Sequence, residues 1–238
     1  MKIAVTGLNA TDNPGPGVPV IRSLKDAKEF TGSIIGLAYD SLDPGIYMKD
    51  LVEKSYLIPY PSGGLDPLFD RILYIHRKEK LDLIIPTLDS ELYGFVKLQP
   101  KFNQLGIKLF LPTFKQLNIR AKDKLFNFCE ENQIKVPKNI LLSSFHDLYM
   151  TSSKIKYPAV VKGIFYEAYT VNNFDELQHA FIKLSAKWGY PIIVQEYLKG
   201  DEFNVVGLGD GTGRTVGAVP MRKLYITDKG KGWAGITI

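Results

Sequence analysis

The sequence predicts an α/β protein with two parts: an open, Rossmann-like, mainly parallel sheet in residues 1–112 and an α+β unit in residues 113–238. Two observations predict this. In the first part, short apolar runs alternate with amphipathic helical stretches, as in a parallel sheet with helices on its faces. In the second part, strands follow one another with few helices between them, which is typical of antiparallel pairing. A chain of 238 residues is long enough for two domains of ordinary size.

The elements expected in residues 1–112 follow the order β-α-β-β-α-β-α-β. Helices are predicted where apolar residues recur at intervals of three and four, as do Leu68, Ile72 and Ile75. Pro112 closes this part of the chain. The expected strands are 2–6, 33–38, 56–59, 83–86 and 107–111, and the expected helices are 18–30, 65–80 and a segment after Asp89.

Residues 113–238 are expected to begin with helices and to continue mainly as strands. The first helix ends before Pro137, because proline cannot continue a helix. Asp210-Gly211-Thr212-Gly213 predicts a hairpin turn, since glycine accepts the positive φ that such turns need. The expected helices are 122–133, a segment from Ser144, and 174–187, and the expected strands are 140–142, 157–163, 168–171, 192–197, 203–208 and 215–225.

Composition excludes several classes of protein. Hydrophobic residues make up 45% and charged residues 23%, the ordinary balance of a soluble protein, and the apolar run after Met1 is too short for a signal peptide or a membrane span. The single Cys129 allows no internal disulfide, which favours a cytoplasmic location. The net charge of +5 is spread along the chain, so no nucleic-acid partner is expected. The three histidines lie far apart in the sequence and predict no metal site.

A glycine-bearing segment at residues 7–17 follows the first strand and precedes the first helix. Such a turn can direct backbone N–H groups at an anion. The segment is long, contains Pro14 and Pro16, and lacks the G-x-G-x-x-G spacing. Three interpretations stay open: a dinucleotide-binding loop, a loop that faces a substrate or an interface, and a structural turn.

The stronger constellation lies in the second part. Lys124 opens a helix, Lys162 ends an apolar strand, and a polar strand end over residues 195–202 follows after another helix. Lysine supplies positive charge for phosphate groups, and a strand end can present backbone and polar side chains to an adenine edge. The alternative is that each lysine is a solvated charge and that residues 195–202 are an ordinary strand end and turn.

The order and spacing of these segments resemble the ATP-grasp superfamily, which includes the large subunit of carbamoyl phosphate synthase and other carboxylate-amine ligases. Residues 1–112 likewise resemble the lead-in, or pre-ATP-grasp, domain of those enzymes, with the segment 83–91 where the family has a strand that runs into a loop. The resemblance covers nearly the whole chain. It implies an ATP-grasp domain in residues 113–238 that is incomplete at its C-terminal side.

The resemblance also implies roles for particular residues. Two residues near the end of the chain, Arg222 and Lys223, are candidates for catalytic contacts with the triphosphate or the acyl phosphate, although a solvated strand end explains them equally well. The remaining candidates would bind ATP: Lys124 and Lys162 at the phosphates, Gln195 and Glu196 at the adenine amino group, the backbone of Glu196, Tyr197 and Leu198 at the adenine ring, and Glu202 at the ribose.

Two departures from the family pattern stand out. The strand lysine is followed by a segment with one glycine, Gly163, where many relatives have a glycine-rich loop. The family also holds Mg²⁺ with two acids and usually an asparagine, because hard cations need oxygen ligands. After Glu202 the only acids are Asp210 and Asp228, and neither is convincing as a ligand. No metal ligand is therefore assigned in this chain, and the Mg²⁺ ligands are expected beyond Ile238.

The resemblance implies ATP-dependent ligation of a small carboxylate to an amine or a related nucleophile, through an acyl phosphate, in the full-length enzyme. ATP and Mg²⁺ are the expected cofactors, a homodimer is an allowed assembly, and this chain alone is expected to turn over weakly or not at all. The alternative is a non-catalytic nucleotide-binding or interaction module. A nicotinamide-dependent oxidoreductase is a third reading, which the prolines of residues 7–17 disfavour.

Overall fold

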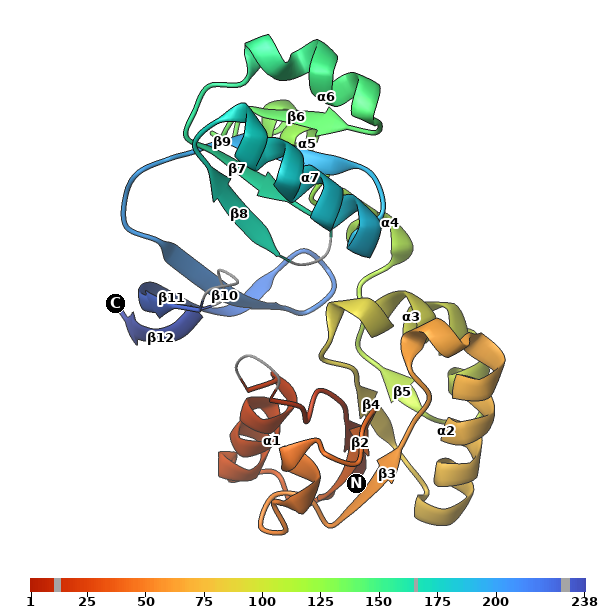
Figure 1. Ribbon diagram of the computed structural model, residues 1–238. Coiled ribbons are helices and arrows are strands. Elements are labelled where there is room, and N and C mark those ends of the chain that lie inside the picture. Colours follow the sequence, from red (N-terminus) through yellow and green to blue (C-terminus); the bar gives the residue numbers. More distant parts are fainter. Residues whose placement is uncertain (11–13, 165–166, 228–231) are drawn as a thin grey trace. The chain divides into compact units, whose positions relative to one another are not determined.

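The computed structural model describes residues 1–10, 14–164, 167–227 and 232–238 (Figure 1). The chain divides into two compact units, Met1–Phe114 and Lys115–Ile238. The first unit contains a parallel sheet and the second contains antiparallel sheets, which confirms the predicted α/β class. Within the described residues, no helix is long and apolar enough to cross a membrane.

The first unit is built on one five-stranded sheet in the order β3-β2-β1-β4-β5, and all of its neighbouring strands are parallel. The predicted order of elements is confirmed. The strands are β1 (Lys2–Val5), β2 (Ser33–Ala38), β3 (Lys54–Leu57), β4 (Leu83–Ile85) and β5 (Lys108–Leu109), and the helices are α1 (Gly17–Asp26), α2 (Leu65–Glu79), α3 (Asp89–Gln104) and the short 3-10 helices η1 (Pro44–Tyr47) and η2 (Pro61–Gly63).

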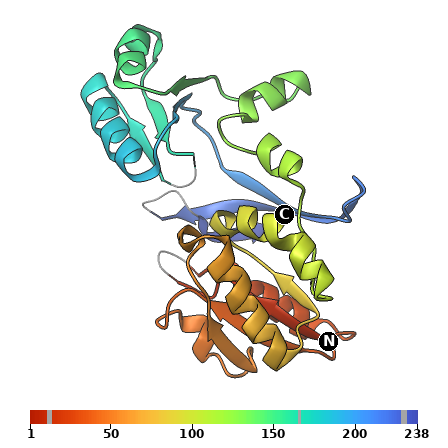
Figure 2. The ribbon, with the colours of Figure 1, turned by 90° about the vertical axis from the view of Figure 1, so that its right-hand side faces the viewer.

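Helices cover both faces of this sheet, as expected for buried parallel strands. Helices α2 and α3 pack on one face, where Ile72, Phe95 and Phe102 meet the strand residues Leu37 and Ile84 (Figures 1 and 2). Helix α1 packs on the other face through Ile21. Every one of these side chains is almost fully buried, so the first unit has an apolar core on each side of its sheet.

Several predicted boundaries in the first unit were wrong, including that of β3, which spans Lys54–Leu57 and not 56–59. Helix α1 ends at Asp26 and not at residue 30, because Leu24 is the last residue of its apolar stripe and residues 25–29 are exposed. The backbone is already extended at Ala27, with φ −72° and ψ 120°. Strand β5 spans only Lys108–Leu109, shorter than the expected 107–111.

The glycine-bearing segment after β1 packs closely against its surroundings. Gly7 has φ +69°, and a Cβ there would lie 2.0 Å from Thr87 Oγ1. A Cβ on Gly17 would lie 1.9 Å from the Thr6 carbonyl oxygen. The Gly17 N–H donates to the Gly7 carbonyl at 3.0 Å, and the Gly15 N–H donates to the Asn9 carbonyl at 2.7 Å. These contacts fit the structural-turn interpretation; residues 11–13 lie outside the described residues.

Two glutamates of the first unit are buried and have different partners. Glu79, 3% exposed, ends α2 and forms ion pairs with Lys2 Nζ and Lys54 Nζ, each at 3.1 Å. The Tyr56 hydroxyl also donates to it. This hydrogen bond, together with those from the two lysines, lowers the pKa of Glu79 to about 2.

Glu91, 1% exposed, lies in the first turn of α3, which follows the short loop after β4. Its Oε1 accepts hydrogen bonds from the Thr6 hydroxyl and from the N–H groups of Thr87, at 2.7 Å, and Leu88, at 2.9 Å. Its Oε2 accepts from the Tyr39 hydroxyl. Burial raises the pKa of Glu91 although these hydrogen bonds oppose the shift, and burial beside Glu91 raises the pKa of Tyr39.

The second unit contains a four-stranded antiparallel sheet in the order β6-β9-β7-β8. Helices α6 and α7 lie over one face, where Leu148 and Phe181 pack on Val161 and Val194. The elements are α4 (Phe114–Ile119), α5 (Leu125–Glu131), β6 (Asn139–Leu142), α6 (Phe145–Thr151), the 3-10 helix η3 (Ser152–Lys154), β7 (Ala159–Lys162), β8 (Ala168–Val171), α7 (Phe174–Trp188) and β9 (Ile192–Glu196).

A separate three-stranded antiparallel sheet follows, formed by β10 (Phe203–Gly209), β11 (Thr215–Ile226) and β12 (Gly232–Thr237). The predicted hairpin between β10 and β11 is confirmed, with Gly211 and Gly213 at positive φ. No residue of this sheet is buried among those described. Strand β12 and helix α4 were not predicted, and the helix predicted over 122–133 is limited to α5.

Candidate functional site

Lys162 and Gln195 meet on the face of the four-stranded sheet that α6 and α7 leave uncovered. Alternate residues of a strand point to opposite faces, and Val161 points toward the helices, so Lys162 points away from them. The register pairs Lys162 with Ile193, which places Gln195 two residues farther along β9 on the same face. Lys162 Nζ donates to Gln195 Oε1 at 2.6 Å. The lysine therefore has a neutral amide as its hydrogen-bond partner.

Glu202 and Lys223 contribute to the electrostatic surroundings of Lys162. Burial lowers the pKa of Lys162, nearby Glu202 opposes that shift, and nearby Lys223 adds to it. Lys223 Nζ lies 2.6 Å from Glu202 Oε2, and the Lys223 N–H donates to the Glu202 carbonyl at 2.8 Å. We call Lys162, Gln195, Glu202 and Lys223 the Lys162 cluster. It holds two cations, one carboxylate and one amide.

Arg222 and Lys223 are both candidates for contacts with the phosphates, and their side chains have different partners in the structure. They are consecutive residues of β11, so they point to opposite faces of the strand. Arg222 Nη2 forms an ion pair with Asp201 Oδ2 at 3.0 Å, and both side chains are about half exposed. Only Lys223 joins the Lys162 cluster.

The strand end after Gln195 is open to solvent. The Glu196 N–H donates to the Lys138 carbonyl at 2.9 Å, and its carboxylate accepts from the Lys138 N–H at 3.2 Å. Tyr197 and Leu198 follow the last residue of β9 and are 43% and 60% exposed. The adenine-binding roles expected for these residues stay predictions.

Lys124 is not brought into the cluster by any hydrogen bond or ion pair among the described residues. It precedes the first residue of α5 and is exposed, and its N–H donates to the Ala121 carbonyl at 2.9 Å. Its contact with phosphate stays a prediction.

No metal site is formed by the part of the chain that the structure describes, since no three His, Cys, Asp or Glu residues gather there in a suitable arrangement. Asp210 is exposed in the β10–β11 turn, where it accepts hydrogen bonds from the Thr212 N–H at 2.8 Å and the Thr212 hydroxyl at 2.7 Å. Asp228 lies outside the described residues.

Glu91 and the side chains near it were not among the predicted site residues, although Glu91 lies in the segment 83–91. The sequence nonetheless held a signal, because the polar segment Asp89-Ser90-Glu91 follows the short loop after the carboxyl end of the apolar strand β4. Polar residues at that position of a parallel sheet commonly face a ligand or cap the next helix. Glu91 caps α3 through the Leu88 N–H.

The fold is similar to several solved enzyme structures. An L-amino acid ligase from Bacillus licheniformis matches with a TM-score of 0.68 and 18% identity, over 93% of this chain and 50% of that chain. The biotin carboxylase domain of the Hydrogenobacter thermophilus 2-oxoglutarate carboxylase, solved with MgADP, ADP and bicarbonate, gives 0.67 and 14%, over 96% and 51%. An N5-carboxyaminoimidazole ribonucleotide synthetase in complex with ADP gives 0.65 and 13%, over 94% and 54%.

These similarities show that the chain has an ATP-grasp fold, as the sequence predicted. No protein-family model and no curated protein matches the sequence. The chain spans about half the length of the solved structures that it resembles. The fold is therefore established by structure, and the activity is a separate question.

Proposed function

We propose that this chain binds ATP through the Lys162 cluster and is the nucleotide-binding part of an ATP-dependent ligase that joins a carboxylate to an amine or a related nucleophile. The observation that carries the proposal is the convergence of Lys162, Gln195, Glu202 and Lys223 within an ATP-grasp fold. Two of the similar structures were solved with ADP, which supports a nucleotide as the ligand.

The chemistry of the cluster suits the parts of ATP. Lys162 is hydrogen-bonded to a neutral amide, so its charge can be directed at a phosphate group. Glu202 can accept hydrogen bonds from ribose hydroxyls. Since Glu202 now pairs with Lys223, a ribose at Glu202 would release Lys223 Nζ toward the triphosphate. Tyr197 and Leu198, exposed after the end of β9, would offer their backbone to the adenine edge.

The proposed reaction has two steps. A carboxylate oxygen of the substrate attacks the γ-phosphorus of ATP and ADP leaves, which gives an acyl phosphate. The nucleophile then attacks the acyl carbon, and inorganic phosphate leaves. In this scheme, Lys162 and Lys223 neutralise the negative charge of the phosphates, while the protein holds the reactants in line. Mg²⁺ would add to that neutralisation when bound, and we assign it no ligand among the described residues.

Calorimetric titration of the chain with ATP in the presence of Mg²⁺ tests the proposal. The wild-type chain should bind, and Lys162→Met should weaken binding by about tenfold or more, because a charge-assisted contact with phosphate is lost. The matched control is Lys135→Met. Lys135 is exposed in the loop after α5 and has no described contact with the cluster, so this change should leave ATP affinity as it was.

The two results that would overturn the proposal are distinct. Equal ATP affinity of Lys162→Met and the wild type would show that the Lys162 cluster is not the ATP-binding site. Absence of ATP binding by a folded wild-type chain would show that this chain does not bind ATP at any site. Circular dichroism of each variant shows whether it is folded.

A further inference from the structure

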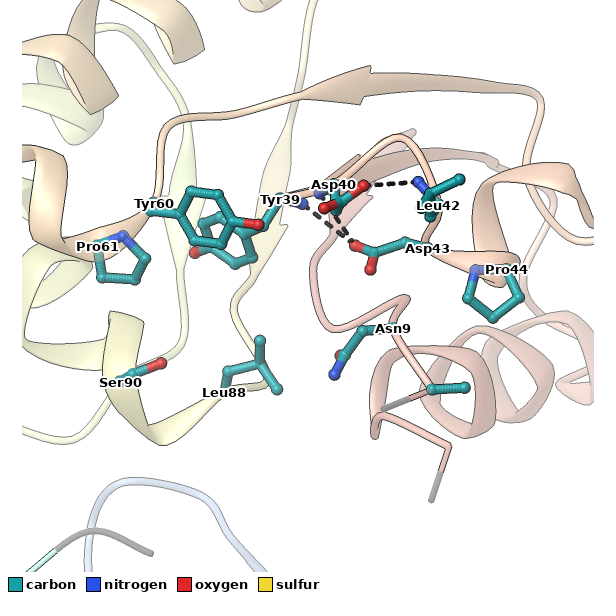
Figure 3. Close-up of a pocket in the computed structure, with 11 residues that line it drawn as sticks. Asn9, Tyr39, Asp40, Leu42, Asp43, Pro44, Tyr60, Pro61, Leu88 and Ser90 are labelled. Atoms are coloured by element: carbon teal, nitrogen blue, oxygen red, sulfur yellow. Dashed lines mark hydrogen bonds between the residues drawn. The ribbon is translucent and has the colours of Figure 1, made fainter. Parts of the chain in front are cut away.

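A pocket of about 360 Å³ lies at the carboxyl edge of the parallel sheet in the first unit (Figure 3). Its walls come from the loops that follow β1, β2, β3 and β4, so four neighbouring strands contribute to it. Its volume is within the range of pockets that hold small molecules. The loops after the strands of an open α/β sheet are also where such folds bind their ligands.

The pocket carries negative charge without positive charge. Asp40 and Asp43, from the loop after β2, are in its wall, and none of its lining residues is Lys, Arg or His. Behind the wall, the Tyr39 hydroxyl donates to the buried carboxylate of Glu91. This local composition contrasts with the net charge of +5 of the whole chain. The pocket therefore favours a cation over an anion.

Asp43 has one carboxylate oxygen that is free to bind a ligand. The side chain is buried, with an exposed fraction of 9%. Its Oδ2 accepts from the N–H groups of Tyr39, at 3.2 Å, and Asp40, at 3.5 Å. No hydrogen bond from another described residue reaches its Oδ1, and Figure 3 shows that oxygen pointing away from these N–H groups, toward the side of Asn9. This oxygen can accept a hydrogen bond from a ligand that enters the pocket.

Aromatic rings form the wall next to the carboxylates. Tyr39 and Tyr60 are stacked, with ring centroids 5.6 Å apart and an interplanar angle of 22°. Tyr60 is 55% exposed although its ring lines the pocket, and Leu42 and Leu88 add apolar surface. An aromatic face attracts organic cations, because the ring quadrupole is negative on that face. A hydrated metal ion gains little from such a wall.

We propose that this pocket binds a small organic cation: a primary ammonium group attached to an apolar or aromatic body. The ammonium donates to Asp43 Oδ1 and to Asp40, and the body packs on the tyrosine pair. Only residues of the first unit take part. The site therefore stands by itself, whether or not the second unit binds ATP.

The test uses 2-phenylethylamine as the probe, titrated into the full chain and followed by calorimetry and by NMR chemical shifts. The amine should bind at least about tenfold more tightly than 3-phenylpropanoate, which has a similar size and the opposite charge. Asp43→Asn should weaken amine binding about tenfold, since the amide can still accept from the Tyr39 and Asp40 N–H groups but lacks the charge. Tyr60→Leu should weaken it about threefold.

Two controls separate this site from other effects. Asp70→Asn, on the exposed side of α2, should leave amine binding unchanged. Lys162→Met should also leave it unchanged, which distinguishes a failure here from a failure of the proposed ATP site. If Asp43→Asn does not fold, Asp40→Asn is measured in its place. Its amide oxygen can keep the hydrogen bond from the Leu42 N–H, and amine binding should still weaken about threefold or more.

Three outcomes would overturn the inference. The first is binding of 3-phenylpropanoate as tight as that of the amine. The second is amine affinity that neither Asp43→Asn nor Asp40→Asn reduces. The third is tight binding of Mg²⁺ alone at this pocket with no binding of the amine, which would make it a metal site.

Discussion

Glu79 and Glu91 are two buried carboxylates of the first unit, and they differ in the kind of group that donates hydrogen bonds to them. Glu79 accepts from two lysines and a tyrosine, and its pKa falls to about 2. Glu91 accepts from two hydroxyls and two backbone N–H groups, and burial raises its pKa. Cationic partners offset the loss of hydration in the first case, and neutral donors do so incompletely in the second. We infer that Glu79 stabilises the sheet through ion pairs with residues of β1 and β3. Glu91 instead holds side chains and loop backbone at the edge of the sheet where the proposed pocket lies.

The largest expected difference between them is in stability. Glu91→Ala should lower the free energy of unfolding by about 3 kcal/mol, because four buried or partly buried donors would lose their acceptor. Glu79→Ala should cost about 1.5 kcal/mol, since Lys2 and Lys54 are partly exposed and can turn to water. Urea denaturation measures both values. A larger loss for Glu79→Ala would reverse the assignment of the two roles.

The second prediction concerns pH and uses Glu79→Gln and Glu91→Gln. The pKa of Glu79 is lowered in the folded state, so its contribution is present above about pH 4.5 and is lost as the pH falls toward about 2. The pKa of Glu91 is raised, so its contribution is present below about pH 4.5 and is lost as the pH rises through the raised value. The cost of Glu79→Gln should therefore shrink in acid.

The cost of Glu91→Gln should change in the opposite direction and shrink as the solution becomes more alkaline. Unfolding free energies measured for both variants and the wild type across the pH range in which the protein folds reversibly would show the two opposite trends. Parallel trends in the two variants would contradict the difference in environment described above.

The smallest expected effect is that of Tyr56→Phe. The hydroxyl of Tyr56 is the largest cause of the low pKa of Glu79, so its removal should raise that pKa measurably and cost about 1 kcal/mol or less. NMR titration of the Glu79 carboxyl group follows the pKa. Tyr74→Phe is the control, because Tyr74 lies on the exposed side of α2 and has no described contact with Glu79. An unchanged pKa in Tyr56→Phe would assign the shift to the lysines.

The order of elements in the first unit could be predicted from the sequence, because its helices and strands follow local periodicity, whereas several of their boundaries could not. Ile72 and Ile75 mark the buried face of α2, and Leu83–Ile85 is apolar throughout, as a strand between two layers should be. Strand β12 was missed because its side chains are mostly exposed and have no alternating pattern to read. Helix α4 was missed because its six residues are too few to show a period.

The candidate ATP site was predictable only in part. The proximity of Lys162 to Gln195 follows from strand alternation once β7 and β9 are known to pair, but the sequence does not give that pairing. Arg222 and Lys223 also have different partners, and the local sequence does not show which face of the strand lies near Lys162. The free oxygen of Asp43 depends on the shape of a loop, which composition does not determine.

The close contact at Gly17 has a consequence far from its own position in the sequence. A side chain there would displace Thr6, whose hydroxyl donates to Glu91, which in turn accepts from the hydroxyl of Tyr39 in the wall of the pocket. A steric clash at the start of α1 would thus act through Thr6 and Glu91 on the aromatic ring of Tyr39. The absence of a side chain at Gly17 thereby helps to hold the wall of a pocket to which Gly17 itself does not contribute.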